Sequence, residues 1–127
     1  MTSPSQFPTH YGYASASDVN WSRSEKAVAR KAIDAALRRE LQEVMRKAKQ
    51  MASQIKQPGD LWDLEQYLTQ RRKEIDCKYD YRYSHLTLIL GKLLHEGWLG
   101  EEERRGLREE KLKSIRSTAE FLAKEWT

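Results

Sequence analysis

The amino-acid sequence predicts an all-α protein, an elongated chain of four helices with a long N-terminal helix. Three observations lead to this fold class. Charged residues make up 33% of the 127 positions, whereas Gly and Pro number only 6 and 3, a balance typical of long helices. Apolar residues recur every three or four positions, and no segment shows the alternating pattern of a strand. A chain of this length usually forms one compact domain.

Residues 1–20 differ in composition from the rest of the chain. They are rich in Ser, Thr, Pro and Tyr and have no hydrophobic periodicity, so packing cannot offset the entropy lost on ordering them. We therefore predict a disordered tail there, followed by a single all-α domain over 21–127. The four helices of this domain are expected at about 23–57, 60–78, 79–96 and 101–125.

The first helix has a clear start and a clear stop. Ser22 and Glu25 form a capping box, in which the hydroxyl and the carboxylate each accept a backbone hydrogen bond, so the helix should begin at about Arg23. Pro58 and Gly59 should stop it, because proline lacks an N–H and glycine tolerates the positive φ of a helix exit.

The same helix carries a heptad-like seam, in which apolar residues alternate at spacings of four and three. A helix of this length spans about 50 Å, longer than a compact domain of this size needs. A twofold partner would bury the same face on both copies, so we predict a homodimer through this seam. The predicted interface residues are Leu37, Leu41, Val44, Met45, Ala48, Met51, Ala52 and Ile55.

The remaining helices follow from local signals. Asp60 can cap the second helix, and Leu61, Leu64, Leu68 and Ile75 continue a buried stripe along it. Residues 86–94 are the most apolar stretch of the chain, so the third helix should form the core. Gly97 should cap that helix, and the glutamates at 101–103 should open the fourth, where carboxylates favour the positive end of the helix dipole.

Nothing in the sequence has the pattern of an enzyme or a metal site. Cys77 is the single cysteine, and the three histidines lack the helical spacing of paired metal ligands. There is no glycine-rich phosphate loop. We therefore expect no catalytic residue, no metal and no cofactor. No apolar window is long enough to span a membrane, and residues 1–9 do not resemble a signal peptide, so we expect a cytoplasmic protein without membrane insertion.

The net positive charge of the chain is concentrated in one segment. Net charge is +4, yet residues 23–58 alone contain ten Lys or Arg against four Asp or Glu, a local charge of +6. Such a segment could bind phosphates, and residues 94–107 resemble a helix-turn-helix. The second helix of that turn would begin with three glutamates, which repel DNA, so nucleic-acid binding is the less favoured alternative.

Trp62 and Arg72 lie off the buried stripe of the second helix. Two interpretations remain open. Trp62 could cover the junction between helices while Arg72 pairs with a neighbouring carboxylate. Alternatively, both could belong to a protein interface, where Trp and Arg are the residue types that contribute most binding energy.

Residues 60–80, DLWDLEQYLTQRRKEIDCKYD, resemble the fluorescence recovery protein family of cyanobacteria. The resemblance begins at Trp21 and extends to near the C-terminus. It implies an all-α homodimer that is not an enzyme. Such a protein binds the photoactivated orange carotenoid protein, on its C-terminal-domain side, accelerates its return to the resting form and helps release it from the phycobilisome. A protein of this kind could also lie at the cytoplasmic face of thylakoids, and a related dimer acting on another protein client is the alternative.

The resemblance also implies roles for individual residues. It puts Met45 at the dimer contact, in agreement with the seam. Three positions, Gln66, Cys77 and Ser114, depart from the family pattern, which has an acidic residue, a glycine and a lysine there. The expected partner-binding residues are Trp62, Arg72, Gln66, Tyr79 and Asp80.

Overall fold

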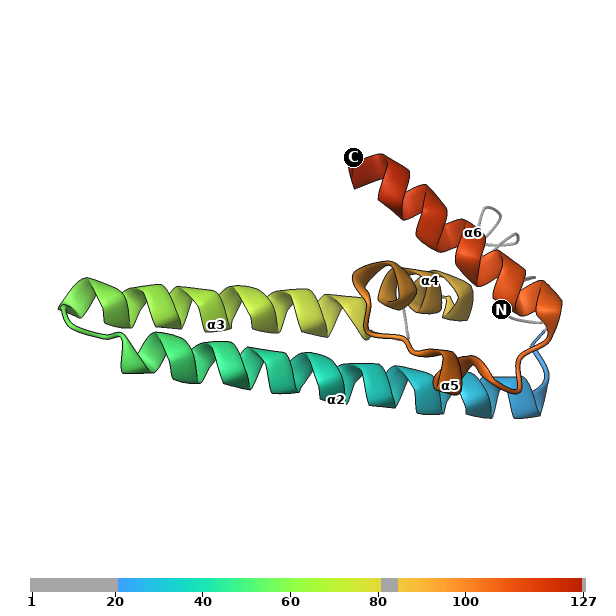
Figure 1. Cartoon of the computed structure of the whole chain (residues 1–127), viewed down its shortest axis with the longest axis horizontal. Coiled ribbons are helices and arrows are strands. Elements are labelled where there is room, and N and C mark those ends of the chain that lie inside the picture. Colours follow the sequence, from blue (N-terminus) through green and yellow to red (C-terminus); the bar gives the residue numbers. More distant parts are fainter. Residues whose placement is uncertain (1–20, 81–84, 127) are drawn as a thin grey trace, which may run out of the picture.

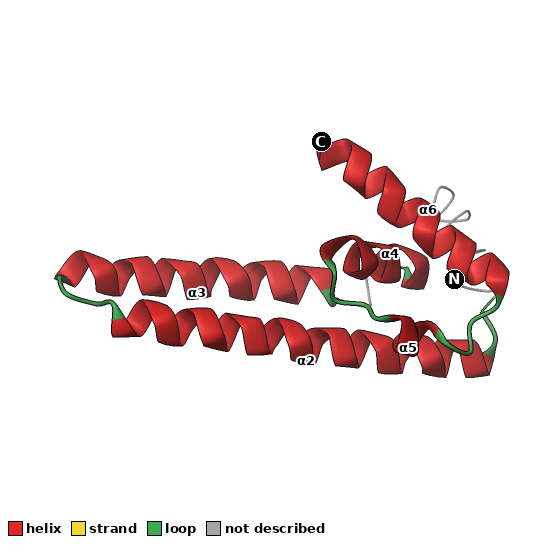
Figure 2. Cartoon of the chain, in the orientation of Figure 1, coloured by secondary structure: helices red, strands yellow, loops and turns green. Residues whose placement is uncertain are grey.

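The structure, a computed structural model, describes residues 21–80 and 85–126, so the expected tail over 1–20 lies outside the described residues. The described part contains five helices and no strand, which confirms the all-α class but gives one helix more than predicted (Figure 2). These helices are α2 (Arg23–Ser53), α3 (Pro58–Lys78), α4 (Leu86–Glu96), α5 (Glu101–Arg104) and α6 (Glu109–Trp126).

The helices form two structurally different regions (Figure 1). The C-terminal half of α2 and the whole of α3 run antiparallel as a two-helix hairpin, which we call the arm. At the other end, α4 and α5 contact the N-terminal half of α2 and α6 packs on α4, and we call this region the head. The elongated shape and the long first helix agree with the prediction from sequence.

The start of α2 is as predicted, but its end is not. Ser22 Oγ accepts from the Glu25 N–H at 3.1 Å, and the Glu25 carboxylate accepts from the Ser22 N–H at 3.1 Å. The helix ends at Ser53 rather than at residue 57. Pro58 does not stop it but opens α3, because the first turn of a helix needs no N–H from that position.

The second and third helices also differ from their expected bounds. The Asp60 carboxylate accepts from the backbone N–H groups of Lys56 and Gln57 at 2.9 and 3.1 Å, so it stabilises the start of α3 from inside the first turn. Helix α4 starts at Leu86, not at residue 79. Its end is as predicted, since Gly97 adopts the left-handed conformation, with φ of 88°.

The fourth predicted helix, over 101–125, is divided into α5 and α6, and this prediction was wrong. Gly106 has a φ of +96°, a conformation that interrupts the helix and that residues with a Cβ rarely adopt. Leu107 then turns into the core, where it is buried. The Arg108 N–H donates to the Glu25 carboxylate at 3.1 Å, so the start of α6 is tied to the start of α2.

The hydrophobic core lies in the head. Alanines on α2 allow close approach of α4, and Gly91 allows close approach of α6, because a Cβ there would lie 2.5 Å from the Thr118 side chain. As predicted, α4 is central to the core, with Ile89, Leu90 and Leu93 almost fully buried. The core residues are Trp21, Ala29, Ala32, Ile33, Ala36, Ile89, Leu90, Leu93, Leu99, Leu107 and Ile115. The arm has no comparable core, so its apolar residues remain partly exposed.

Candidate functional site

The predicted seam on α2 is only partly covered. Leu37, Val44, Ala48 and Met51 are half-buried, and Ala52 is exposed. Ile55, predicted as the last seam residue, is half-buried in the loop that follows the end of α2 at Ser53. The two remaining seam residues belong to the most exposed large apolar side chains of the chain, with Leu41 at 43% and Met45 at 55%. Within one chain, this surface is therefore available for a further contact.

Helix α3 extends this apolar surface. The stripe predicted on this helix is buried only in part, since Ile75 is buried but Leu61 and Leu68 are 47% and 41% exposed. Because α2 and α3 run antiparallel, helical periodicity places these leucines on the same side of the arm as Leu41 and Met45. We call these four residues the arm face. Exposed apolar groups that gather in this way are typical of a protein interface.

Trp62 lies beside this face, and its side chain is not used to cover the helix junction. It is 65% exposed, which is unusual for the largest apolar side chain. Gln66, one turn further along α3, is also exposed. It lines a shallow depression of about 340 Å³ together with Asp63, Tyr67 and Gln70. An exposed indole next to polar groups can be desolvated by a partner at low entropy cost.

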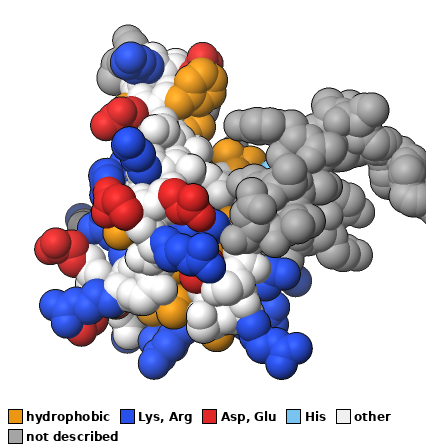
Figure 3. All heavy atoms as spheres, turned by 90° about the vertical axis from the view of Figure 1, so that its right-hand side faces the viewer, with side chains coloured by type: hydrophobic (Ala, Val, Ile, Leu, Met, Phe, Trp, Pro, Cys, Tyr) orange, Lys and Arg blue, Asp and Glu red, His pale blue; other side chains and the backbone are white. Residues whose placement is uncertain are grey.

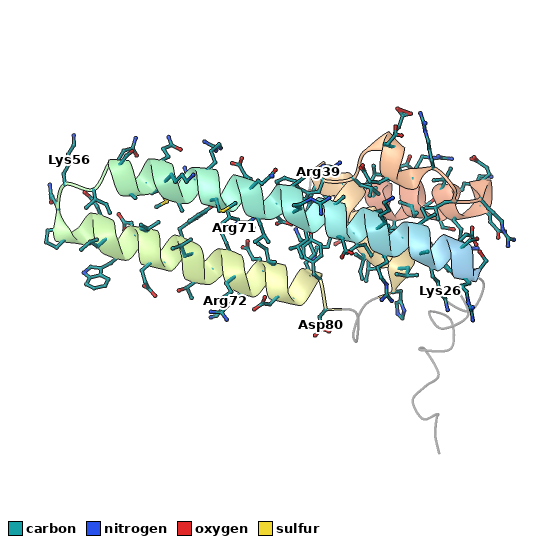
Figure 4. The ribbon with its side chains drawn as sticks, turned by 90° about the horizontal axis from the view of Figure 1, so that it is seen from below. Lys26, Arg39, Lys56, Arg71, Arg72 and Asp80 are labelled. Carbon is teal, nitrogen blue, oxygen red and sulfur yellow. The ribbon has the colours of Figure 1, made fainter. Side chains whose placement is uncertain are left out.

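Arg72 points away from α2, whereas its neighbour Arg71 points towards it (Figure 4). The Arg72 side chain is 85% exposed, and its Nε lies 3.8 Å from Asp76 Oδ2. Such an exposed pair contributes little to stability, so the guanidinium is free to change partner. The predicted pairing of Arg72 with a neighbouring carboxylate is thus present, but the pair is weak and exposed. The alternative, a role of Arg72 in a protein interface, stays open.

Tyr79 and Asp80 lie at the junction between arm and head. Both are half-buried, and Tyr79 forms the C-cap of α3. The Tyr79 hydroxyl donates to Glu40 Oε1 at 2.9 Å, and burial together with this hydrogen bond raises the pKa of the phenol. In the single chain, Tyr79 is therefore held inside the protein, apart from the exposed surface around Trp62.

Sequence reasoning missed the buried ionic cluster to which Tyr79 belongs. Glu40, 1% exposed, accepts at 2.8 Å from both Arg71 Nη2 and Lys78 Nζ, and Lys78 also donates to Glu96 at the end of α4. Burial by itself would raise the pKa of Glu40, but the hydrogen bonds from Lys78, Arg71 and Tyr79 outweigh it and lower the pKa. The cluster therefore fixes α3 and α4 to α2.

A second polar feature opens beside this cluster. It is a cavity of about 610 Å³, open to solvent, and its walls include Lys73, Lys92 and Trp98. Cys77 is exposed at its rim. Across residues 21–80 and 85–126, no three His, Cys, Asp or Glu side chains lie close enough to hold a metal ion. Nor does any helix in these ranges have the length and apolar character to cross a membrane.

The family model described as "Photoprotection regulator fluorescence recovery protein" matches residues 21–119, which include the whole arm and most of the head. This chain belongs to the fluorescence recovery protein family. The resemblance seen in residues 60–80 is thereby confirmed, and the chain is a member of a family of photoprotection regulators.

Individual members of the fluorescence recovery protein family agree in sequence and in fold. The protein from Synechocystis sp. PCC 6803 is 36% identical over 102 residues, which cover 80% of this chain and 94% of the relative. The solved structure from Fremyella diplosiphon is 38% identical, with a TM-score of 0.73 over 80% of this chain and 99% of that one. The Synechocystis structure has 37% identity and a TM-score of 0.72, with coverage of 79% and 98%.

Proposed function

We propose that this chain is a non-enzymatic regulator that binds the photoactivated orange carotenoid protein on its C-terminal-domain side. It accelerates the return of that protein to the resting form and helps to release it from the phycobilisome. The proposal rests on family membership together with one structural observation, the exposure of Trp62 and Arg72 on the same helix. Such a regulator would act in the cytoplasm, at the cytoplasmic face of thylakoids.

The proposed action needs no covalent chemistry. A binding protein accelerates the relaxation of its partner only if it binds the transition state of relaxation more tightly than the activated form. Trp62 would supply apolar contact area, and Arg72 would exchange its weak pair with Asp76 for a carboxylate of the partner. Gln66 would contribute an amide at the same surface, while Tyr79 and Asp80 would set the end of α3 from which this surface extends.

We further propose that the active form is a homodimer through the predicted seam. The support is the arm face, because a second copy would cover Leu41 and Met45 and the same residues on its own chain. A dimer formed in this way leaves Trp62, on the outer side of α3, accessible to the partner.

Recovery of the photoactivated orange carotenoid protein in the dark tests the proposal. We expect the wild-type chain to accelerate the red-to-orange absorbance change, and Trp62→Ala or Arg72→Ala to slow this effect. Loss of a central Trp or Arg typically costs about 2–4 kcal/mol, a roughly 30-fold to 1,000-fold loss of affinity. Arg116→Ala, which removes an exposed arginine from α6, is the matched control and should leave the acceleration unchanged.

The experiment also separates the alternatives. No acceleration by the wild-type chain, at concentrations where it is dimeric, would contradict the proposed partner and favour another protein client. Equal loss of activity in Arg116→Ala would contradict the assignment of the surface on α3. Tight binding to RNA or DNA, with an affinity that falls steeply with salt, would favour the nucleic-acid alternative.

A further inference from the structure

A groove in the head lies between α2 and the segment that contains α5. Its volume is about 400 Å³. Its floor is apolar and is formed by Val28, Ala32 and Ala35 of α2. The groove is remote from Trp62, because α5 contacts the N-terminal half of α2 and Trp62 lies at the far end of the arm (Figure 1). It is thus separate from the surface considered above.

One rim of this groove is held in place by an ionic contact. Arg39 donates to both carboxylate oxygens of Glu103, at 2.8 and 2.9 Å, and to the Trp98 carbonyl at 3.0 Å. The Gly100 N–H also donates to Glu103, at 2.8 Å. These contacts lower the pKa of Glu103 to about 2, with the hydrogen bond from Arg39 as the main cause. The rim is therefore preformed, and its charges compensate each other.

The other rim carries an excess of positive charge. Lys31 and Arg38 line the groove, and no carboxylate of the described ranges 21–80 and 85–126 forms an ion pair with either, although Asp34 lies about one turn from both on the same helix. Both acids of the groove are already paired, Glu103 with Arg39 and Glu102 with Arg105 at 3.4 Å. Figure 3 shows Lys and Arg side chains gathered on the lower part of this end of the molecule, where α2 begins. The surroundings therefore attract negative charge.

The spacing of Lys31 and Arg38 limits which ligands can pair with both side chains. Lys31 and Arg38 are seven residues apart on one helix, which corresponds to about 10 Å along its axis. Ala35 lies between them on the apolar floor. Two carboxylates about 10 Å apart on one face occur at positions i and i+7 of a helix, whereas positions i and i+3 of an extended peptide point to opposite faces. An apolar side chain between them would reach the floor.

We propose that this groove binds an acidic amphipathic peptide segment of a partner protein, with carboxylates at Lys31 and Arg38 and an apolar side chain over Ala35. The charge complementarity favours an acidic ligand, and the apolar floor favours a peptide over a nucleic acid. The inference does not depend on the function proposed above, since it uses none of the same residues.

Fluorescence anisotropy with a labelled synthetic peptide tests this proposal. The probe contains glutamates on both sides of a central leucine, and the control probe has glutamine in place of each glutamate. We expect the acidic probe to bind the full chain and the control probe to bind at least about tenfold more weakly. The double variant Lys31→Glu/Arg38→Glu should bind the acidic and the control probe with the same affinity, whereas Lys31→Arg/Arg38→Lys should still prefer the acidic probe.

A second double charge reversal, remote from the groove, tests whether peptide binding depends on the groove residues or only on the net charge of the chain. Lys49→Glu/Lys56→Glu makes the same change on the exposed surface of the arm and should leave peptide binding unchanged. An equal loss in both double variants would overturn the proposal, as would tighter binding of a single-stranded oligonucleotide than of the peptide.

Amide chemical shifts of the wild-type chain give a second readout that needs no variant. Peptide addition should shift the amides of Ala32, Ala35 and Glu103 more than those of α3. Shifts confined to α3 and the arm face would place the peptide elsewhere and would equally overturn the proposal.

Discussion

The carboxylate of Glu40 is almost fully buried and still has a lowered pKa, because three donors from α3 and its C-cap surround it. A buried charge is stable only when its partners remain in place. Each donor comes from a residue near the arm–head junction, so the geometry of the junction depends on this one side chain. The same argument explains why Lys78 can be buried, since its ammonium lies between Glu40 and Glu96.

Glu40→Gln should therefore destabilise the protein by about 2–4 kcal/mol, because the ammonium of Lys78 stays buried and loses one of its two counter-charges. Urea denaturation followed by circular dichroism measures this change. Glu43→Gln is the matched control, since Glu43 pairs with Arg46 on the exposed surface of the same helix. This substitution should lower the free energy of unfolding by less than about 1 kcal/mol. Similar losses in both variants would show that the buried cluster has no special role.

At the scale of the elements, helix ends that depend on neighbouring residues could be predicted from the sequence, whereas contacts between residues far apart in the chain could not. The capping box of Ser22 and Glu25 and the terminal Gly97 depend on neighbouring residues, and both were predicted. The break at Gly106 was missed, because the charged sequence on both sides has the composition of one continuous helix. The pairing of Glu40 with Lys78 joins residues 38 positions apart, and no periodicity reveals such a contact.

The exposed part of the candidate site was more predictable than the buried part. Trp62 and Arg72 lie off the apolar stripe of α3, so periodicity alone placed them on the surface. Tyr79 was expected in the same site, yet its hydroxyl is bound to Glu40. Its position could not be read from the sequence, because it depends on how α3 ends against α2.

Gly106 and Gly59 offer a test of the interpretation of the helix break. Gly106→Ala should destabilise the protein by about 1–2 kcal/mol, because the residue has a φ of +96° and a Cβ would lie 3.0 Å from Val28 Cγ2. Gly59→Ala should instead stabilise it by about 0.5–1 kcal/mol, since Gly59 is helical and a Cβ there meets nothing within 4 Å. Thermal unfolding measures both, and a stabilising Gly106→Ala would contradict the strained conformation.

For the whole molecule, burial is uneven. The head has a closed core, whereas the arm is a single layer of two helices whose best-buried apolar residue is Ile75. A two-helix hairpin cannot cover its own apolar residues on both sides, so the arm face remains open in one chain. The core of the head is thus complete within one chain, while the arm is the part whose apolar residues the proposed dimer would cover.

Met45→Glu should shift the protein from dimer towards monomer while its helix content remains unchanged. Met45 is 55% exposed in the single chain, so a glutamate there meets water in the monomer and disturbs no internal packing. In the proposed dimer, the same glutamate would be buried without a partner, which costs several kcal/mol. Sedimentation velocity at low micromolar concentration measures the shift, and circular dichroism verifies the fold.

Gln50→Glu is the matched control, because it adds the same charge to an exposed position on the opposite side of α2. It should leave the dimer intact. If Met45→Glu also sedimented as an unchanged dimer, the arm face would be excluded as the contact between copies. If both variants became monomeric, net charge rather than the seam would control association. Dissociation by Met45→Glu alone would place Met45 in the contact between copies, because an isologous interface would then bury the new carboxylate of both copies without partners.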